Sequence, residues 1–543
     1  MNTTNPNFQS RPQIMGNKGM ASTPHPLASQ AAIDILKQGG NAVDAAIAAA
    51  SVVSVVQPFS SGLGGVGYAT IYNAKEKKTE ICEFSGHIPE NTQHNSVPYK
   101  EGQLDIYALR AEKKNLKGSI IPGAVAGWEA MSQKHGQLPL AKSLNSAIEL
   151  ARDGFPISDL LCETIKEQRS NLISWETSKL VYFNQGELYQ PGDNFKQTNL
   201  ANTLKAIAIN GAKEFYAGKV ASDIVEYVNN NGGHFTKEEF AEYKVNWLEP
   251  ITFQYKSHSI KLAPPPTSDV VFAESLNILS ELHPEKWEQF SNAYIHANIE
   301  ATKFGRTDRV TFIGDPNFDD SIPVDTILSN KYAKQQASRI NMNKAMQVDP
   351  DPVINPKHTI QLCVVDQWGN AVNLLQTVGM HFGCSVVAGN SGVTMNGMLY
   401  FSPEDPSLPN SIKPNHRIEM NPLNLMVFDD KNELKLVLGS PGGKTVIQTV
   451  RQMLANVIDF DMNIQQAIDT PRFLSEQDGH TVTVEEMLLL THPNIKQELE
   501  ALGHKVEVVP AQHGCGQGIY INSRNHTLMG GSDFRRESYS LGY

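Results

Sequence analysis

Residues Pro356–Val372 read PKHTIQLCVVDQWGNAV, and this stretch decides the architecture expected for the chain. The run Ile360–Val365 is apolar and rich in β-branched side chains, and the turn Asp366–Asn370 contains a glycine between two Asx residues. An extended pattern then resumes over Ala371–Thr377. Such a sequence is typical of a β-hairpin. We therefore predict two antiparallel strands, with the polar residues shaping the turn rather than reacting.

The first position of this hairpin carries a hydroxyl group, because Thr359 follows His358 directly. A cut between these two residues would give Thr359 a free α-amine beside its own hydroxyl. An α-amine titrates near pH ~8 and is able to act as the base for that hydroxyl. The stretch is therefore a candidate N-terminal threonine nucleophile, whereas a hairpin without any chemical role is the alternative that the local pattern leaves open.

Composition excludes several classes of protein. The 543 residues are 40% hydrophobic and 19% charged, with a formal net charge of −11. An acidic chain with only short basic runs does not favour nucleic acid or an anionic membrane as a partner. The sequence contains no stretch of about 18 uninterrupted apolar residues, so no membrane span is predicted. Residues 1–18 are polar and lack the apolar core of a secretory signal, so we expect a flexible N-terminal segment and a cytoplasmic protein.

The cysteines give no sign of a disulfide framework or a zinc site. They are odd in number, scattered, and never spaced as CxxC. Their positions are Cys82, Cys162, Cys363, Cys384 and Cys515. We expect Cys363, within the first hairpin strand, to be a small core residue.

Two glycine-rich stretches resemble nucleotide motifs but do not satisfy them. Gly62–Gly67 has the letters of the dinucleotide fingerprint, yet a predicted helix precedes it and a strand follows, which reverses the required order. Gly439–Thr445 has three residues rather than four before Gly-Lys-Thr, so it is not a phosphate loop. Its position before a predicted helix nevertheless leaves backbone amides that suit an oxyanion.

Periodicity and end signals predict the other main elements. Asn41 is a plausible N-cap for a buried alanine-rich helix that extends to Val56. Gly118–Gly127 is expected to be a strand and turn, and Asn341–Pro356 an exposed linker. Further helices are predicted at Pro26–Lys37, Trp128–His135, Leu140–Asp153, Asn292–Arg306 and Val446–Ile458, and strands at Leu425–Asp429 and Leu434–Gly439. This order favours a layered α/β protein over a doubly wound parallel sheet.

Several segments in order resemble successive blocks of the γ-glutamyltransferases. They are GMASTPHPLASQAAIDILKQGGNAVDAAIAA, QPFSSGLGGVGYATIY, IPGAVAGWEAM, AIELARDGFPIS, LAPPPTSDVV, HANIEATKFGRTDRVTFIGDP, HTIQLCVVDQWGNAV and LGSPGGKT. The resemblance implies a four-layer αββα N-terminal-nucleophile hydrolase without a cofactor or metal. It also implies a precursor that cuts itself into a large subunit, residues 19–358, and a small subunit, residues 359–543. The two fragments would form one intertwined catalytic domain, and a dimer of two such heterodimers is an alternative to a single heterodimer.

The resemblance also assigns roles around the hairpin. Thr359 would attack an amide carbonyl and form an acyl-enzyme, which water or an amine then resolves. Thr377 matches the residue that steadies the nucleophile, although a cross-strand threonine without that role is an equal alternative. Gly442 and Gly443 match the glycines whose amides hold the oxyanion.

Departures from the family pattern fall on the substrate side. The arginine, aspartate and serine pair that bind the glutamyl head correspond here to Ser85, to Tyr400, and to Ile418 with Glu419. Other residues expected to line the pocket are His87, His381, His416 and Arg417. Glutathione-like γ-glutamyl amides are the substrates implied by the family. A small non-glutamyl amide, as in oxamate amidohydrolase-like or acylase-like members, is the alternative, and an inactive, uncleaved binding protein is a third possibility.

Overall fold

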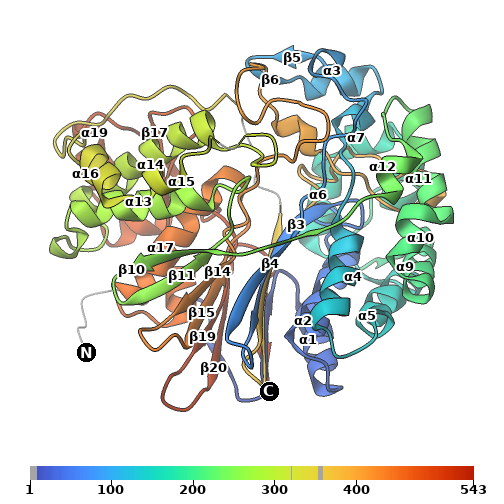
Figure 1. Cartoon of the computed structure of the whole chain (residues 1–543), viewed down its shortest axis with the longest axis horizontal. Coiled ribbons are helices and arrows are strands. Elements are labelled where there is room, and N and C mark those ends of the chain that lie inside the picture. Colours follow the sequence, from blue (N-terminus) through green and yellow to red (C-terminus); the bar gives the residue numbers. More distant parts are fainter. Residues whose placement is uncertain (1–8, 320, 353–358) are drawn as a thin grey trace.

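Two antiparallel sheets lie face to face between two layers of helices in the computed structural model, which describes residues 9–319, 321–352 and 359–543 (Figure 1). The first seven-stranded sheet has the order β21 (Tyr539–Gly542), β2 (Gly19–Thr23), β12 (Ile360–Asp366), β13 (Ala371–Thr377), β3 (Val66–Asn73), β4 (Lys78–Phe84) and β9 (Asn246–Leu248). The second has the order β1 (Ile14–Gly16), β20 (Leu528–Ser532), β19 (Gln517–Ile521), β15 (Leu434–Gly439), β14 (Leu425–Phe428), β11 (His258–Leu262) and β10 (Ile251–Tyr255).

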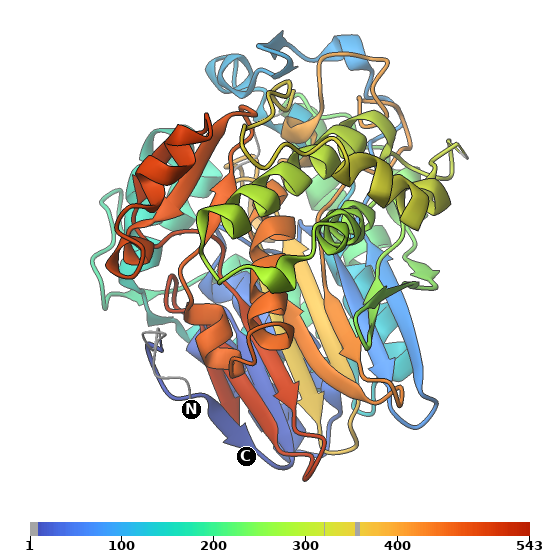
Figure 2. The ribbon, with the colours of Figure 1, turned by 90° about the vertical axis from the view of Figure 1, so that its left-hand side faces the viewer.

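Helices cover the outer face of each sheet, which confirms the predicted four-layer αββα fold. The first sheet is covered by α1 (Pro26–Lys37), α2 (Ala42–Val56), α4 (Ala124–His135) and α5 (Leu140–Asp153), with α9 (Thr198–Asn210), α10 (Ala212–Ala217), α11 (Lys219–Asn230) and α12 (Lys237–Ala241) outside them. The second is covered by α13 (Asp269–Glu281), α14 (Asn292–Phe312), α15 (Val324–Ile327), α16 (Asn330–Ala337), α17 (Val446–Ile458) and α18 (Ile464–Asp469), which lie toward the viewer in Figure 2.

Smaller elements complete the fold. A three-stranded sheet of β16 (Phe473–Ser475), β17 (Thr481–Glu485) and β18 (Lys505–Val509) packs with α19 (Ile495–Ala501) beside α14. Short pieces near the first helical layer are α3 (Ile106–Ala111), α6 (Asp159–Glu167), α7 (Arg169–Ile173), α8 (Glu176–Tyr182) and the strand pairs β5 (Tyr99–Lys100) with β6 (Gln103–Leu104) and β7 (Phe155–Pro156) with β8 (Asn194–Phe195). Among the described residues, no helix has the length and apolar character needed to cross a membrane.

Local sequence signals fix several boundaries as predicted. The side chain of Asn41 accepts hydrogen bonds from the backbone amides of Val43 and Asp44. The Asp44 carboxylate in turn accepts a hydrogen bond from the backbone amide of Asn41. This capping box begins α2, whose residues are buried throughout. Strand β13 has the predicted bounds and β12 runs one residue further than predicted, to Asp366; the two pair in antiparallel register from Ile360 opposite Gln376.

Three predictions of local structure are wrong. Helix α4 begins at Ala124 instead of Trp128, so Gly127 lies inside the helix and not in a turn. Its lack of a side chain lets the helix approach the Phe84 ring, because a Cβ on Gly127 would come within 2.6 Å of that ring. Helix α14 continues past the predicted end to Phe312. Residues 341–352 are not an exposed linker throughout, since Ala345 and Asp351 are buried; residues 353–356 lie outside the described part.

The hairpin turn is tied to its surroundings by the Asp366 carboxylate. Oδ1 accepts from the amides of Trp368 and Asn370, while Oδ2 accepts from the Ala42 amide and the Asn370 side chain. The Asn370 side chain in turn accepts from the Ala74 amide. These bonds join the turn to the start of α2 and to the β3–β4 turn, which confirms the structural role expected for the turn residues.

The two halves of the chain on either side of residue 359 share both sheets. In the first sheet, β2 lies between β12 and β21, so a strand from before residue 359 is hydrogen-bonded on both edges to strands from after it. In the second sheet, β1 pairs with β20 and β11 pairs with β14. The last carbonyl of the chain, at Tyr543, also accepts from the amides of Asn17 and Lys18.

Asn373 forms one of the polar links between the two sheets. Asn373 is fully buried on β13, and its Nδ2 donates to the carbonyls of Leu425 and Leu438 on the facing sheet at 3.1 and 3.0 Å. Its Oδ1 accepts from Nε2 of Gln361 at 2.5 Å. A buried amide with partners on three strands fixes the register of one sheet over the other.

We expect Asn373→Ala to lower the free energy of unfolding by about 2–4 kcal/mol, because two buried carbonyls and the Gln361 amide lose their partner. Asn343→Ala, at an exposed asparagine, is the matched control and should change it by less than about 0.5 kcal/mol. Equilibrium denaturation of both variants measures the difference. Equal stability of the two would show that the link contributes nothing.

Candidate active site

Thr359 lies at the entrance to β12, directly opposite the end of β13. Its side chain is 8% exposed, and its Oγ1 donates to Oγ1 of Thr377 at 3.2 Å. Oγ1 of Thr377 also accepts from the Gly379 amide at 2.9 Å. The hairpin thus brings together the two threonines that the sequence singled out, and the Gly379 amide restricts the rotation of the Thr377 side chain.

A pocket opens beside these two hydroxyl groups. Its wall contains Gly443 from the turn before α17, together with Glu419, the Asn421 side chain and five apolar residues. The apolar residues are Leu375, Met398, Phe401, Met420 and Val446. No basic side chain is among the described residues that line it.

The glycine turn at this pocket needs residues without side chains. Gly442 has φ of 153° and Gly443 has φ of 57°, and a Cβ on Gly442 would come within 2.9 Å of Oγ1 of Thr445. Oγ1 of Thr445 donates to the Gly442 carbonyl at 2.8 Å, which fixes the turn. The predicted oxyanion glycines thus lie at the end of α17 nearest Thr359, and their role as donors stays a prediction.

Glu419 carries the negative charge of this pocket, and that charge is balanced. Its Oε2 accepts from Nη1 of Arg309 at 2.8 Å, and its Oε1 accepts from the Ser268 hydroxyl. Arg309 also forms an ion pair with Asp351. Burial lowers the Arg309 pKa, but the two carboxylates outweigh it and raise the pKa, so the guanidinium stays charged. Sequence reasoning missed Arg309, Ser268 and Asp351, because their partners are far away along the chain.

Arg536 is a further side chain that contacts Thr359, and its charge acts on His381. Nη1 of Arg536 donates to the Thr359 carbonyl at 3.4 Å. Burial lowers the pKa of His381 to about 3, and the positive charge of Arg536 contributes, so this ring is neutral. The ring packs edge-on against Phe59. Arg536 was also missed, since nothing in the sequence distinguishes it from its neighbour Arg535.

Three predicted substrate residues gather in a different pocket. Ser85, His87 and Arg417 line a cavity of about 370 Å³ whose lining does not include Thr359. Buried Glu83 organises it by accepting from the Ser85 hydroxyl at 2.8 Å and pairing with Arg417 at 3.2 Å. The rim adds acidic residues Glu90, Glu238, Glu239, Glu242 and Asp315.

The other two predicted substrate residues line neither cavity. The Tyr400 hydroxyl is buried and donates to the Asn115 carbonyl at 2.9 Å. His416 stacks on Phe318 with a ring-centroid distance of 3.7 Å. Substrate contacts by these residues, and by Ser85, His87 and Arg417, stay predictions.

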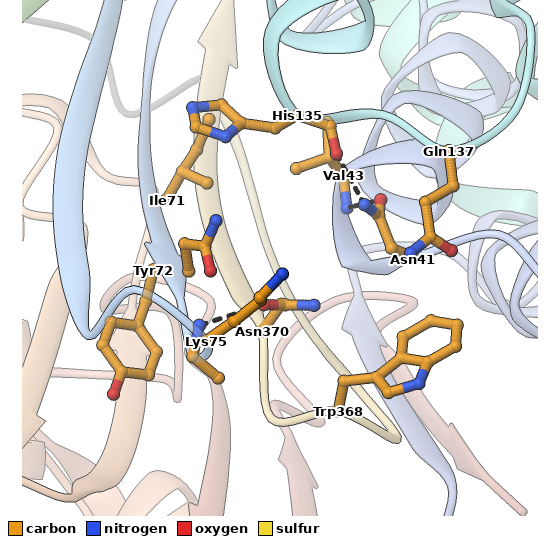
Figure 3. A pocket seen from close by; sticks show the side chains of 11 residues that line it. Asn41, Val43, Ile71, Tyr72, Lys75, His135, Gln137, Trp368 and Asn370 are labelled. Atoms are coloured by element: carbon orange, nitrogen blue, oxygen red, sulfur yellow. Dashed lines mark hydrogen bonds between the residues drawn. The ribbon is translucent and has the colours of Figure 1, made fainter.

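A third cavity, of about 530 Å³, lies at the far end of the hairpin (Figure 3). Trp368 and Asn370 of the turn contribute to it, whereas Thr359 is at the opposite end of β12, about 20 Å away at ~3.4 Å per residue. The side-chain amide of Asn41 donates to the His135 carbonyl at 2.6 Å, and this bond holds the start of α2 against the end of α4. This cavity is too distant to hold a group that reacts at Thr359.

A four-layer αββα sandwich with a hydroxyl residue at the start of a central strand is the architecture of the N-terminal-nucleophile hydrolases. The family profile described as Gamma-glutamyltranspeptidase matches residues 28–543. The chain belongs to the γ-glutamyltranspeptidase family.

Relatives of both expected kinds resemble the whole chain. The glutathione hydrolase proenzyme of Escherichia coli strain K12 is 34% identical over 556 residues, covering 98% of this chain and 93% of that protein. The acylase ACY 1 proenzyme of Pseudomonas sp. strain V22 is 30% identical, covering 96% and 93%. The crystal structure of cephalosporin acylase from Bacillus halodurans superposes with a TM-score of 0.89 at 29% identity, covering 100% and 99%.

We expect Thr377→Val to reduce amide turnover about tenfold to a hundredfold, because the valine keeps the shape but removes the hydrogen bond that orients the Thr359 hydroxyl. Thr377→Ser, which retains the hydroxyl, is the matched control and should keep most of the rate. Steady-state kinetics with a chromogenic amide measure both. An unchanged rate in the valine variant would leave Thr377 as an ordinary sheet residue.

Proposed function

We propose that this chain is a self-processing amidohydrolase in which Thr359, freed by a cut after His358, is the nucleophile. The observation that carries the proposal is the 3.2 Å contact between the hydroxyls of Thr359 and Thr377 at the wall of a pocket that also contains Gly443. His358 itself lies outside the described residues. The names of the relatives, which include the word proenzyme, support a precursor that is processed.

In the cut protein the α-amine of Thr359 would take the proton from Oγ1 as this oxygen attacks the amide carbonyl carbon. The carbonyl oxygen becomes an oxyanion, which the amides of the Gly442–Gly443 turn are placed to stabilise. When the carbon–nitrogen bond breaks, the protonated α-amine returns the proton to the leaving amine. The resulting ester at Thr359 is then attacked by water, or by an acceptor amine, through the same proton transfers.

The geometry favours an amide with a weakly polar acyl group over a γ-glutamyl amide. A γ-glutamyl head carries a carboxylate and an ammonium group, and burying them without partners costs several kcal/mol. The described lining near Thr359 contains five apolar side chains, the Thr377 hydroxyl, the Asn421 side chain, and the Glu419 carboxylate, which already has Arg309 and Ser268 as partners. The acylase relatives support this choice, whereas the glutathione hydrolase relatives support the γ-glutamyl alternative.

We expect purified, active protein to consist of two fragments corresponding to residues 1–358 and 359–543. Thr359→Ala should give a single uncut chain without amidase activity, because both the attacking oxygen and the later nucleophile are lost. Thr359→Ser should still be cut, since it keeps a hydroxyl. Intact-mass analysis and a denaturing gel measure the cut. A fully active, uncut preparation would exclude the mechanism.

A substrate panel separates the two acyl classes. We expect kcat/KM for an aliphatic or aromatic acyl anilide to exceed that for γ-glutamyl anilide by about tenfold or more, because one or two unpaired buried charges cost at least ~1.4 kcal/mol. Oxamate, a small polar amide, completes the panel. A preference for the γ-glutamyl substrate would favour the glutathione hydrolase alternative.

A further inference from the structure

Helix α14 carries a row of buried polar side chains for which the reaction at Thr359 has no use. His296, Glu300, Lys303 and Arg309 are each no more than 5% exposed. Arg306 lies between the last two. Because successive members are three or four residues apart, they are neighbours along the helix surface and form a continuous polar row. Such a row in a helix buried on most sides requires partners.

The partners come mainly from the segment that precedes the proposed cut. Nε2 of His296 bonds to the Asn341 carbonyl at 3.0 Å. Glu300 accepts from the Met346 amide at 2.9 Å, and Nζ of Lys303 donates to the Met346 carbonyl at 2.6 Å. The row therefore binds the main chain of this segment at two separate places.

The row ends with a charge–charge contact. Arg309 pairs with the buried carboxylate of Asp351, and the Asp351 amide donates to the Gln477 carbonyl at 2.7 Å. The same guanidinium contacts Glu419 in the wall of the Thr359 pocket. Arg309 thus joins Asp351, which lies upstream of the proposed cut, directly to the pocket beside Thr359.

Within the row, the Glu300 carboxylate is paired with Lys303 rather than being free for a metal ion. His296, Glu300 and His504 lie close enough together to be metal ligands. However, the Lys303 ammonium is already 2.7 Å from the Glu300 carboxylate. Burial, together with the charge of Lys303, lowers the pKa of His504 to about 3. A neutral His504 is able to donate to Nδ1 of His296, at 2.8 Å, while His296 donates to Asn341.

We infer that this row positions the chain upstream of Thr359 for self-cleavage, with Asp351 as the final positioning residue. The inference rests on the proposed function. Eight residues beyond Asp351 reach Thr359, a span of at most about 28 Å. Fixing Asp351 would restrict the positions that this short connection allows the bond before Thr359 to take relative to the Thr359 hydroxyl.

Asp351→Asn tests this inference, because asparagine keeps the size and one acceptor oxygen but removes the charge that pairs with Arg309. We expect self-cleavage of freshly made precursor to slow by at least about tenfold. Asp349→Asn, an identical change at an exposed position two residues away, is the matched control and should stay within about twofold. Asp351→Glu should restore most of the rate.

Three measurements distinguish the outcomes: cleavage rate, unfolding temperature, and turnover per cleaved chain. A positioning role predicts that the cleavage rate falls by a clearly larger factor than the turnover per cleaved chain, with little change in the unfolding temperature. A wild-type cleavage rate in Asp351→Asn would overturn the inference and leave the proposed function intact. A parallel loss in all three measurements would also overturn it, because it would indicate a general structural role for Asp351. A wild-type protein that is active without being cut would instead overturn the proposed function itself.

Discussion

Strand β12 is confined on every side, and this confinement determines where the chemistry of the molecule takes place. Its edges are hydrogen-bonded to β2 and β13, its residues are buried throughout, and the Asp366 carboxylate holds its far end against α2. A strand fixed in this way cannot slide, because a shift of one residue would turn its apolar side chains to the wrong face. Thr359 directly precedes this strand, so the position of the strand sets the position of Thr359.

The two pockets near this end of the sheet have opposite characters, which bears on the divergence of the family. The pocket at Thr359 is lined mainly by apolar groups, whereas the pocket around Glu83 and Arg417 has an acidic rim. Ser85, one of the residues that the family resemblance predicts to contact substrate, donates to Glu83 and is not part of the described lining of the Thr359 pocket. In the proposed enzyme, the Thr359–Thr377 pair and the polar cluster around Glu83 would therefore have separate roles.

Much of the fold was predictable because its signals are local. Alternating β-branched residues and an Asx-rich turn define β12 and β13, and Asn41 defines the start of α2. Gly127 was misinterpreted as a turn residue, because only the tertiary structure reveals that it lets α4 contact Phe84. The threonine pair was predictable from the hairpin register combined with the family resemblance. Arg309, Asp351 and Arg536 were not, since ion pairs between residues distant in sequence leave no local pattern.

The shared sheets have a consequence for what a chain break before Thr359 would mean physically. With β2 inserted between β12 and β21, each fragment supplies edges that the other must fill. Either fragment made alone would expose long rows of unpaired amides and carbonyls, the kind of surface that drives aggregation. The nicked protein is therefore best regarded as a single folded body with two extra termini, and its fragments as pieces that attain their shape only by folding while joined.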